Sequence, residues 1–530
     1  MTRRQRQRGI LSRLAAVILP TVAALANGRR RAARSMRLER LDRLSAAYDA
    51  AQTTTGNSRH WRNADLLSAD AANAPEVRST IRSRARYEAQ ESNSVAKGMV
   101  LTLANDTIGT GPRLQMLLRD KKANARIEAT FSRWAQRIRL AEKLRTMRVA
   151  KAVDGEAFAM LTTRPVRTLD VSLDVRPFEA DLVESPWLSD NLNERDGIRF
   201  DEFGEPREYH VYKQHPGDLL AGFNPFAGEW TDASSILHVY RCDRPGQHRG
   251  VSELAPALPL FALLRDYTLA VLHSARSAAK FTAVLETQSG ARDDDGNSWD
   301  PEVDPFDVVD IDYDMLTSLP WGWKLNQFKA EQPTTTFEMF RNAIINEIAR
   351  CLNMPFNVAA GNSSSYNYAS GRLDHQVYHR SIDVEISQWE PCILDRIVEA
   401  WFDEALLIPG YLPPIEALPY IPHQWNWDGR DHVDPQKEAN AQQMKVKSGT
   451  THRAREYAIE GLDIDAEDEI AASGYNVSVA EYRRALFDAH FAATNGGGDG
   501  TGDDDAADET TDETDGDQSE EEKAAVAAAI

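Results

Sequence analysis

Histidine side chains are the first candidates for chemistry in this sequence, because imidazole serves both as a metal ligand and as a general base near neutral pH. His210, His215 and His238 lie in strand-like or turn segments. Their spacing matches no metal-ligand pattern, and the three cysteines form no CxxC pair. We therefore interpret these histidines as ordinary strand and turn residues, and we predict neither a metal site nor a disulfide framework.

The motifs of common enzyme classes are also missing. The dipeptide Gly-Lys occurs nowhere, which excludes the GxxxxGK(S/T) phosphate-binding loop, and neither GxSxG nor HExxH is present. Gly109 and Gly111 are followed by Leu114 where a dinucleotide-binding loop needs its third glycine. The serines from Ser363 to Ser365 could supply a nucleophile, but no general base is indicated near them, so we interpret them as part of a flexible loop. We predict no catalytic residue and no cofactor.

Two tryptophans are candidates for nucleic-acid contacts. Trp425 and Trp427 could stack on exposed bases, as aromatic side chains do in proteins that bind single strands. Few basic residues surround them. We therefore expect both side chains to pack inside the protein.

The distribution of charge limits the partners of the protein. The 530 residues include 42% hydrophobic and 27% charged residues, as is typical of a folded globular chain. The net charge of −20 is uneven, since residues 1–43 carry +10, residues 497–530 carry −12 and the chain between them carries −18. An acidic body argues against a broad basic face that grips DNA, although it permits DNA to slide past. The apolar stretch 14–26 is interrupted by Pro20 and is too short to cross a bilayer, so we expect a basic arm and no membrane span.

Two kinds of element must position these residues in the first half of the chain. The apolar pattern predicts helix from Asp65 to Leu103, closed by a Gly/Pro cluster at 109–112. Residues 156–240 instead alternate in short stretches, such as 209–212 and 236–240, which predicts β-strands separated by turns.

Two further helices enclose an acidic insert. Apolar residues at helical spacing predict one helix at 259–283 and another at 335–352, the second with a capping-box spacing at its start. Small residues in the second half of the first helix would let other helices approach closely. Between the helices, residues 287–333 are rich in aspartate, and the alternation from Phe306 to Tyr313 predicts a strand with one acidic, solvated face.

A third long helix is predicted from Leu373 to Leu407, with a kink at Pro391. The last folded unit starts near Trp425 and is predicted to be helical, with a capping box at Ser478 and Glu481. The Gly-, Asp- and Glu-rich sequence beyond residue 495 cannot bury enough apolar surface to fold, so we expect disorder there. The buried side of the third helix would contain Val377, Ile386, Trp389, Ile393, Ile397 and Trp401.

Several local sequences, taken in their order, resemble the lambda-type portal family of tailed bacteriophages over most of residues 44–475. Ala369 departs from the serine that is usual in this family, and the acidic tail is not part of the pattern. The matching segments are Tyr48-Asp49-Ala50-Ala51, Arg82-Ser83-Arg84-Ala85-Arg86 with Asn93 and Gly98, Asp154-Gly155-Glu156, His215-Pro216-Gly217-Asp218, Leu237-His238-Val239-Tyr240 with Arg244-Pro245-Gly246-Gln247 and Arg249-Gly250-Val251-Ser252, Tyr366-Asn367-Tyr368-Ala369-Ser370-Gly371-Arg372, and Trp427 with Asp434-Pro435 and Lys437-Glu438-Ala439.

The resemblance implies an α+β portal fold with a mixed α/β wing, a two-helix stem, a small β-containing clip and a helical C-terminal crown. Such proteins assemble as a ring, typically of twelve subunits. On this sequence the segments would be a basic N-terminal arm at 1–43, the first part of the wing at 44–258, stem helices at 259–286 and 334–353, the clip at 287–333, a channel loop at 354–371, the kinked spine helix of the wing at 372–424, the crown at 425–494 and a disordered acidic tail at 495–530.

The resemblance also implies a role without catalysis. A portal ring lies at a capsid vertex in the virion, is assembled in the host cytoplasm, and forms the channel through which DNA is packaged and ejected. The expected partners are further copies of the chain, the terminase large subunit, major capsid and scaffold proteins, head-completion or tail connector proteins, and double-stranded DNA that passes without sequence specificity.

Candidate site residues follow from this assignment. Arg276 and Lys280, one turn apart on the first stem helix, could contact phosphates weakly, and inter-subunit or solvated charges are an equal alternative. The channel loop would add Asn362, Ser363, Ser364 and Ser365, and the clip would offer Asp307, Asp310 and Asp312 as a terminase-docking surface. Two alternatives stay open, namely another head structural or head-completion protein, and a phage nuclease or protease.

Overall fold

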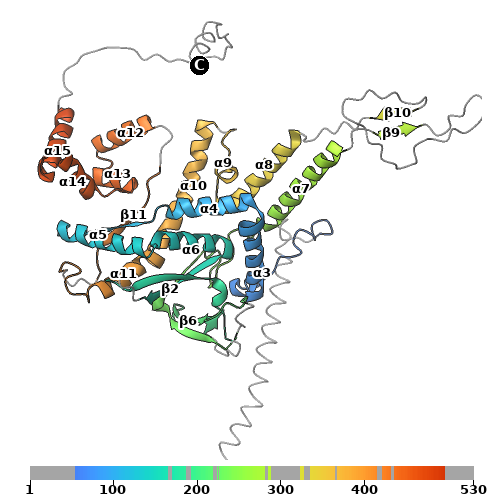
Figure 1. Cartoon of the computed structure of the whole chain (residues 1–530), viewed down its shortest axis with the longest axis horizontal. Coiled ribbons are helices and arrows are strands. Elements are labelled where there is room, and N and C mark those ends of the chain that lie inside the picture. The colour runs from blue at the N-terminus through green and yellow to red at the C-terminus, as the bar shows by residue number, and fades with distance from the viewer. Residues whose placement is uncertain are drawn as a thin grey trace, which may run out of the picture. The chain divides into compact units, whose positions relative to one another are not determined.

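The protein is described from a computed structural model (Figure 1). By its internal contacts the chain divides into two units, residues 1–72 and 73–530. In the first unit the described residues form turns followed by the one-turn helix α2 (Ala69–Ala72). The predicted basic arm, the predicted strand 306–313 and the acidic tail lie outside the described residues. The described residues are 54–164, 170–186, 193–218, 224, 226–280, 284–287, 323–326, 335–364, 367–414, 420–430 and 435–495.

The second unit begins with helices. The helix predicted from 65 to 103 is interrupted, because Asn93 has an extended backbone and its side chain caps a new helix by accepting hydrogen bonds from the backbone N–H groups of Val95 and Ala96. That new helix runs past Leu103 and ends at Gly109, whose φ is +54°. The helices of this region are α3 (Pro75–Arg86), the π-helix η3 (Tyr87–Ser92), α4 (Ser94–Ile108), α5 (Lys121–Arg137) and α6 (Leu140–Asp154).

Two antiparallel sheets follow, and they contain the strands predicted at 209–212 and 236–240. One sheet has the order β3-β2-β8 and the other is a meander with the order β4-β5-β6-β7. Helices and antiparallel strands thus occupy separate parts of the chain, which makes the fold α+β. The strands are β2 (Glu156–Thr163), β3 (Leu173–Phe178), β4 (Glu194–Arg195), β5 (Ile198–Phe200), β6 (Pro206–Tyr212), β7 (Gly228–Asp232) and β8 (Ile236–Tyr240).

The two helices predicted around the acidic insert are confirmed as α7 (Leu258–Lys280) and α8 (Thr335–Ala349). They run side by side away from the sheets (Figure 1). Between them in sequence, β9 (Val284–Thr287) and β10 (Trp323–Asn326) pair antiparallel, so the insert leaves and returns through a two-stranded ladder. The 3₁₀ turn η6 (Arg350–Leu352) and the short helix α9 (Phe356–Ala360) come after α8.

The third predicted helix is confirmed as α10 (Tyr368–Trp389), the π-helix η7 (Glu390–Leu394) and α11 (Asp395–Ala405), so regular α-helical geometry is interrupted where the kink is predicted. Pro391 opens the π-helix, because proline cannot donate the regular helical hydrogen bond. The prediction that Val377 is buried is wrong. Its side chain is 58% exposed, because Tyr378 and Ile382 form the face of α10 that packs into the core.

The C-terminal part is helical as predicted from Pro435 onward, but it begins with a strand, so the prediction of helix near Trp425 is wrong. Trp425 lies in β11 (His423–Asn426), which pairs antiparallel with β1 (Arg113–Met116). The predicted capping box is confirmed, since Ser478 and Glu481 exchange hydrogen bonds between their side chains and backbone N–H groups. The helices are α12 (Pro435–Lys447), α13 (Arg453–Ile459), α14 (Ile464–Gly474) and α15 (Val479–Asn495).

Three apolar clusters form the core. The largest packs α5, α6 and α11 against β2, β3 and β8, and its centre is aromatic, with the rings of Phe131 and Trp401 edge to face at 5.3 Å. The second joins α4, α6 and the first turns of α7 to α8 and α10. The third lies between the two sheets around Phe158. Among the described residues, no helix is long and apolar enough to span a membrane.

Candidate functional site

The carboxylate of Glu156 is the centre of a buried charge network where α6 passes into β2. Its side chain is fully buried and accepts hydrogen bonds from Nε and Nη2 of Arg249, at 2.8 and 2.7 Å, and from Nη2 of Arg82, at 3.0 Å. Burial raises the pKa of a carboxyl group, but Arg249 and the ring of His238 hold the pKa of Glu156 well below its usual value. Glu156 is therefore ionised, and it neutralises arginines that are themselves buried.

Backbone contact brings the two halves of this network together. A Cβ atom at Gly250 would lie 2.1 Å from the carbonyl oxygen of Gly155, so any side chain there would collide with the backbone. The backbone N–H of Gly250 donates to Glu156 at 3.1 Å. The segments Asp154-Gly155-Glu156 and Arg249-Gly250, which carry the family resemblance, thus form one packed unit although they are far apart in sequence.

Further ion pairs surround this centre. Asp154 pairs with Arg86 at 2.8 Å, and Asp181 pairs with both Arg82 and Arg86 at 2.7 Å. Burial favours a raised pKa for Asp181, but the two arginines lower it overall. The residues Arg82 and Arg86 of the Arg-rich segment on α3 are therefore tied to both strands and turns of the sheet region.

A second buried network ties α7 to the third long helix. Arg148 and Lys151 of α6 are buried and face two carboxylates, Glu253 just before α7 and Glu385 on α10. Burial opposes ionisation of Glu385, but Arg148 and Lys151 lower its pKa to about 2. The start of the α7–α8 pair is thereby fixed to both α6 and α10.

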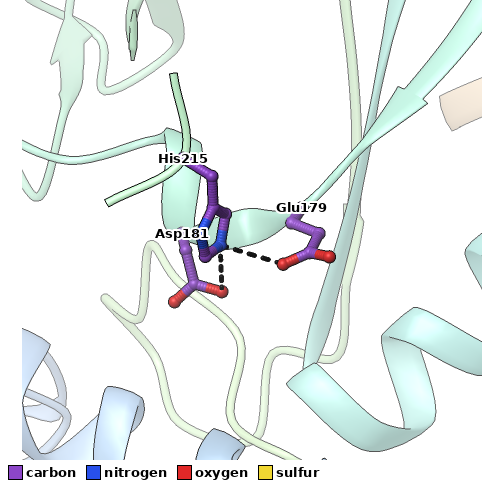
Figure 2. Close-up of side chains that lie close together, drawn as sticks. All are labelled: Glu179, Asp181 and His215. Carbon is purple, nitrogen blue, oxygen red and sulfur yellow. Dashed lines mark ion pairs between the residues drawn. The ribbon is translucent and has the colours of Figure 1, made fainter. Parts of the chain in front are cut away.

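The predicted histidines do not converge on one place. Nδ1 of His210 lies 2.7 Å from the carbonyl oxygen of Glu184, and Nε2 of His238 lies 3.3 Å from Oε2 of Glu156. His215 instead belongs to a cluster with Glu179 and Asp181, whose side chains point toward one another in Figure 2. Nε2 of His215 lies 2.9 Å from Oε2 of Glu179 and 3.6 Å from Oδ2 of Asp181.

The hydrogen bonds of this cluster argue against a metal centre, although an imidazole and two carboxylates are ordinary metal ligands. The backbone N–H of Gly217 donates to Nδ1 of His215 at 3.0 Å, so that nitrogen is an acceptor and the ring proton lies on Nε2. A metal bound between the carboxylates would need a lone pair on the same Nε2. Asp181 is also paired with two arginines, so we interpret the cluster as part of the ion pairs that surround Glu156.

The pair of helices α7 and α8 meets through aromatic side chains. Tyr267 stacks on Phe337 with ring centroids 5.6 Å apart and lies edge to face with Phe340 at 4.9 Å. Arg265 anchors the start of the pair through an ion pair with Glu88 of η3. Several large apolar side chains of the two helices remain exposed to solvent, namely Leu263, Leu269, Leu272, Met339 and Phe340.

The predicted channel residues lie on two elements. Arg276 is exposed on α7, and Lys280 is the last residue of the same helix, with its side chain outside the description. Asn362, Ser363 and Ser364 lie exposed in the turn after α9, where the N–H of Ser364 donates to the side chain of Asn362 at 2.9 Å. Ser365 and the aspartates 307, 310 and 312 lie outside the described residues. The segment 354–371 also includes α9 and the start of α10, so it is not all loop.

The two tryptophans are structural. Trp425 is buried and its indole N–H donates to Asp395 at 2.9 Å, and the indole of half-buried Trp427 donates to Glu390 at 2.8 Å. This confirms the prediction that they pack inside the protein.

Sequence reasoning identified the residues of the Glu156 network as family segments but not as a network. The missing signal is the combination of charged residues and glycine inside otherwise apolar stretches, as in Asp154-Gly155-Glu156, because a buried charge requires a partner. No sequence signal marks the second network, because most of its members lie on ordinary amphipathic helices. These residues are Arg148, Lys151, Glu253 and Glu385.

Comparison with known proteins gives the chain its family. Residues 54–385 match the model of the family described as "Phage portal protein, lambda family". The "Probable portal protein" of Halomonas phage phiHAP-1 is 24% identical over 316 residues, which cover 56% of this chain and 58% of that protein. The chain therefore spans less than two thirds of this relative.

Solved structures that match the chain come from gene transfer agent (GTA) particles. The structure "Neck of empty GTA particle computed with C6 symmetry" has a TM-score of 0.42 and 15% identity, over 72% of this chain and 93% of that one. "Neck of native GTA particle computed with C12 symmetry" has a TM-score of 0.42 and 13% identity, over 73% and 94% of the two chains. Since the family model matches well over half of the sequence, the chain belongs to the lambda family of phage portal proteins.

Proposed function

We propose that this protein forms the portal ring at a capsid vertex of a phage virion, and that double-stranded DNA passes through the ring during packaging and ejection. The observation that carries this proposal is the α7–α8 pair in a chain of the portal family. Only the first turns of α7 are packed into the core, while Leu269, Leu272 and Met339 are exposed along the pair. Apolar surface of this extent on a projecting helix pair needs cover, and further copies of the chain in a closed ring would supply it.

In this proposal α7 and α8 are the stem and the insert 287–333 is the clip. Residues 44–258 and the kinked helix of 372–424 form the wing, 354–371 the channel loop, and 425–494 the crown. The turn with Asn362, Ser363 and Ser364 is exposed, which supports the placement of this loop in the channel. Its short polar side chains would not bind phosphates tightly. Ser365 belongs to the same loop.

DNA would slide through the ring rather than be gripped. The chain between the basic arm and the acidic tail has a net charge of −18. A channel wall with this excess of acidic side chains would repel phosphates, so DNA would meet little friction while a separate motor supplies the work. Arg276 is exposed and would make at most weak phosphate contacts, together with Lys280. The ring itself would be passive and would not act as an enzyme.

The clip would dock the proteins that the ring must meet. Its aspartates, including Asp307, Asp310 and Asp312, would attract a more basic surface on the terminase large subunit and later on head-completion or tail connector proteins. Capsid and scaffold proteins would surround the wing, and assembly would take place in the host cytoplasm.

Particle mass and electron microscopy of the purified chain test the ring. We expect closed rings with a central hole, for which the family resemblance implies twelve copies. The double variant Leu269→Asp with Leu272→Asp should prevent closure, whereas Leu407→Asp should not, since Leu407 is 81% exposed in the turn after α11 and lies off the helix pair. A wild-type chain that stays monomeric at micromolar concentration would overturn the proposal. If the double variant still forms rings, the proposed ring stands, but the α7–α8 pair is not its interface.

A further inference from the structure

The C-terminal helices α13, α14 and α15 are attached to the rest of the chain by polar contacts. None of their described residues belongs to the three apolar clusters of the core. Between these helices and the segment formed by β1 and α5 lies a cavity of about 1140 Å³, lined by apolar residues such as Phe131 and Val479 and by polar residues such as Gln115 and Glu469. The two parts therefore face each other across a space that admits water.

One end of this attachment is a tight backbone contact. A Cβ atom at Gly461, in the turn after α13, would lie 2.1 Å from the carbonyl oxygen of Trp427. Asp428 accepts hydrogen bonds from the backbone N–H and the hydroxyl of Thr110, at 2.5 and 2.6 Å, and Arg113 reaches both Asp428 and the carbonyl oxygen of Gly461. This end cannot slide without breaking several short contacts, so it behaves as a pivot.

At the start of α14, next to this contact, two side-chain contacts join residues that line the cavity. Gln115 donates to Asp463 at 2.9 Å, and the ammonium group of Lys121 pairs with Asp465 at 2.6 Å. Lys121 is 65% exposed, so water can solvate it when the pair opens. Asp465 also pairs with Arg483 of α15, at 2.5 Å, so it keeps a partner after Lys121 leaves.

The three helices have their own internal ties. The carboxylate of Asp468 on α14 is buried and pairs with Arg453 of α13 at 2.8 Å and with Arg483 of α15 at 2.7 Å. These pairs connect all three helices and involve no residue outside them. The helices can therefore move together without losing their internal contacts.

We propose that α13, α14 and α15 rock as one rigid body about the pivot at 427–429 and 460–461, and that the Lys121–Asp465 ion pair is the latch that closes this body over the cavity. Opening exchanges the exposed Lys121–Asp465 ion pair and the Gln115–Asp463 hydrogen bond for contacts of these groups with water. Exposed ion pairs and hydrogen bonds that water can replace contribute little, so both positions are accessible. Salt weakens an exposed ion pair and thus favours the open position. The inference does not depend on ring formation.

Single-molecule energy transfer in the full-length chain tests the latch. One dye is attached at Arg133→Cys on α5 and the other at Arg484→Cys on α15, after Cys242, Cys351 and Cys392 are replaced by serine. The doubly labelled copy is diluted among unlabelled copies. Raising NaCl from about 0.05 to about 0.5 M should lower the transfer efficiency by opening the latch. Lys121→Met should shift the open-to-closed ratio about two- to five-fold at low salt and remove the salt response.

The neighbouring Lys122→Met is the matched control, because it removes the same charge and, among the described residues, Lys122 forms no ion pair with a carboxylate, unlike Lys121. It should behave as the wild type, and Lys121→Arg should restore the closed position. An unchanged distribution in Lys121→Met, or an equal salt response in Lys121→Met and wild type, would overturn the latch.

Hydrogen exchange separates rocking from unfolding. The amides of α14 and α15 should stay protected in Lys121→Met, whereas Asp468→Asn, which breaks the internal pairs, should expose them. Equal loss of protection in both variants would mean that Lys121 supports the fold of these helices rather than their position, and would overturn the proposal.

Discussion

Replacing Glu156 with glutamine should destabilise the protein through its buried arginines. The substitution keeps the shape of the side chain but removes the charge that Arg249 contacts at 2.7 and 2.8 Å. Removing one partner of a buried ion pair costs about 3–5 kcal/mol, because the other charge stays buried and uncompensated.

The contacts place this variant near the lower end of that range. Arg82 keeps its pair with Asp181 at 2.7 Å, and NH1 of Arg249 keeps the carbonyl oxygens of Val183 and Asp196. We therefore expect a loss of about 3 kcal/mol in the free energy of unfolding. With an unfolding entropy of about 2 cal/mol/K per residue over several hundred residues, this corresponds to a melting temperature lower by about 3 °C.

Denaturant titration and thermal unfolding of the variant measure this loss. The control is Glu142→Gln, because Glu142 pairs with Arg139 at 3.3 Å on the surface and should contribute less than about 0.5 kcal/mol. Adding Arg249→Met to Glu156→Gln should recover part of the loss, since it removes the unpaired charge. A loss below about 1 kcal/mol, or equal losses in Glu156→Gln and Glu142→Gln, would refute the reasoning.

Three further predictions concern other parts of the chain. Gly250→Ala should cost about 1–3 kcal/mol in thermal unfolding, because its Cβ would meet a backbone oxygen, whereas Gly98→Ala, where no atom lies within 4 Å, should not destabilise. The pKa of Glu385 is about 2 in the folded protein and about 4.5 in the unfolded chain, so its stabilising effect is present above pH 4.5 and is lost as the pH falls toward 2. Glu385→Gln should therefore flatten the pH dependence of the free energy of unfolding between these values, and an unchanged slope would contradict this. The third prediction replaces the clip aspartates Asp307, Asp310 and Asp312 together by asparagine. Rings should stay intact, but terminase binding and its salt dependence should weaken, and unaltered affinity at two ionic strengths would exclude the docking role.

Local rules predicted the elements that depend on neighbours in sequence. The helices around the insert, the interruption of the third helix at Pro391 and the cap formed by Ser478 and Glu481 follow from apolar spacing, proline geometry and capping chemistry within a few residues. These rules also failed locally at Val377. Its spacing fits a buried helical face, but which face of an amphipathic helix packs depends on the neighbours it meets.

Long-range pairings were beyond these rules. The strand β11 has only four residues, with no alternation that distinguishes it from a loop, and its partner β1 lies more than 300 residues earlier. The Glu156 network likewise needs residues of α3, β2, β8 and the turn after β8. Family resemblance marked these segments as belonging together in order, while the contact between Gly155 and Gly250 required the structure.

The ladder of β9 and β10 makes the acidic insert an exchangeable cassette. Thr287 pairs directly with Trp323, so the two ends of the intervening chain are held one strand spacing apart. The entropic cost of closing a loop grows only with the logarithm of its length, so the length of the insert has little effect on the stability of the helices on either side. An insert of another length could therefore be joined at the same two strands without changing the helix pair. In the proposed ring, the docking surface could then change independently of the channel.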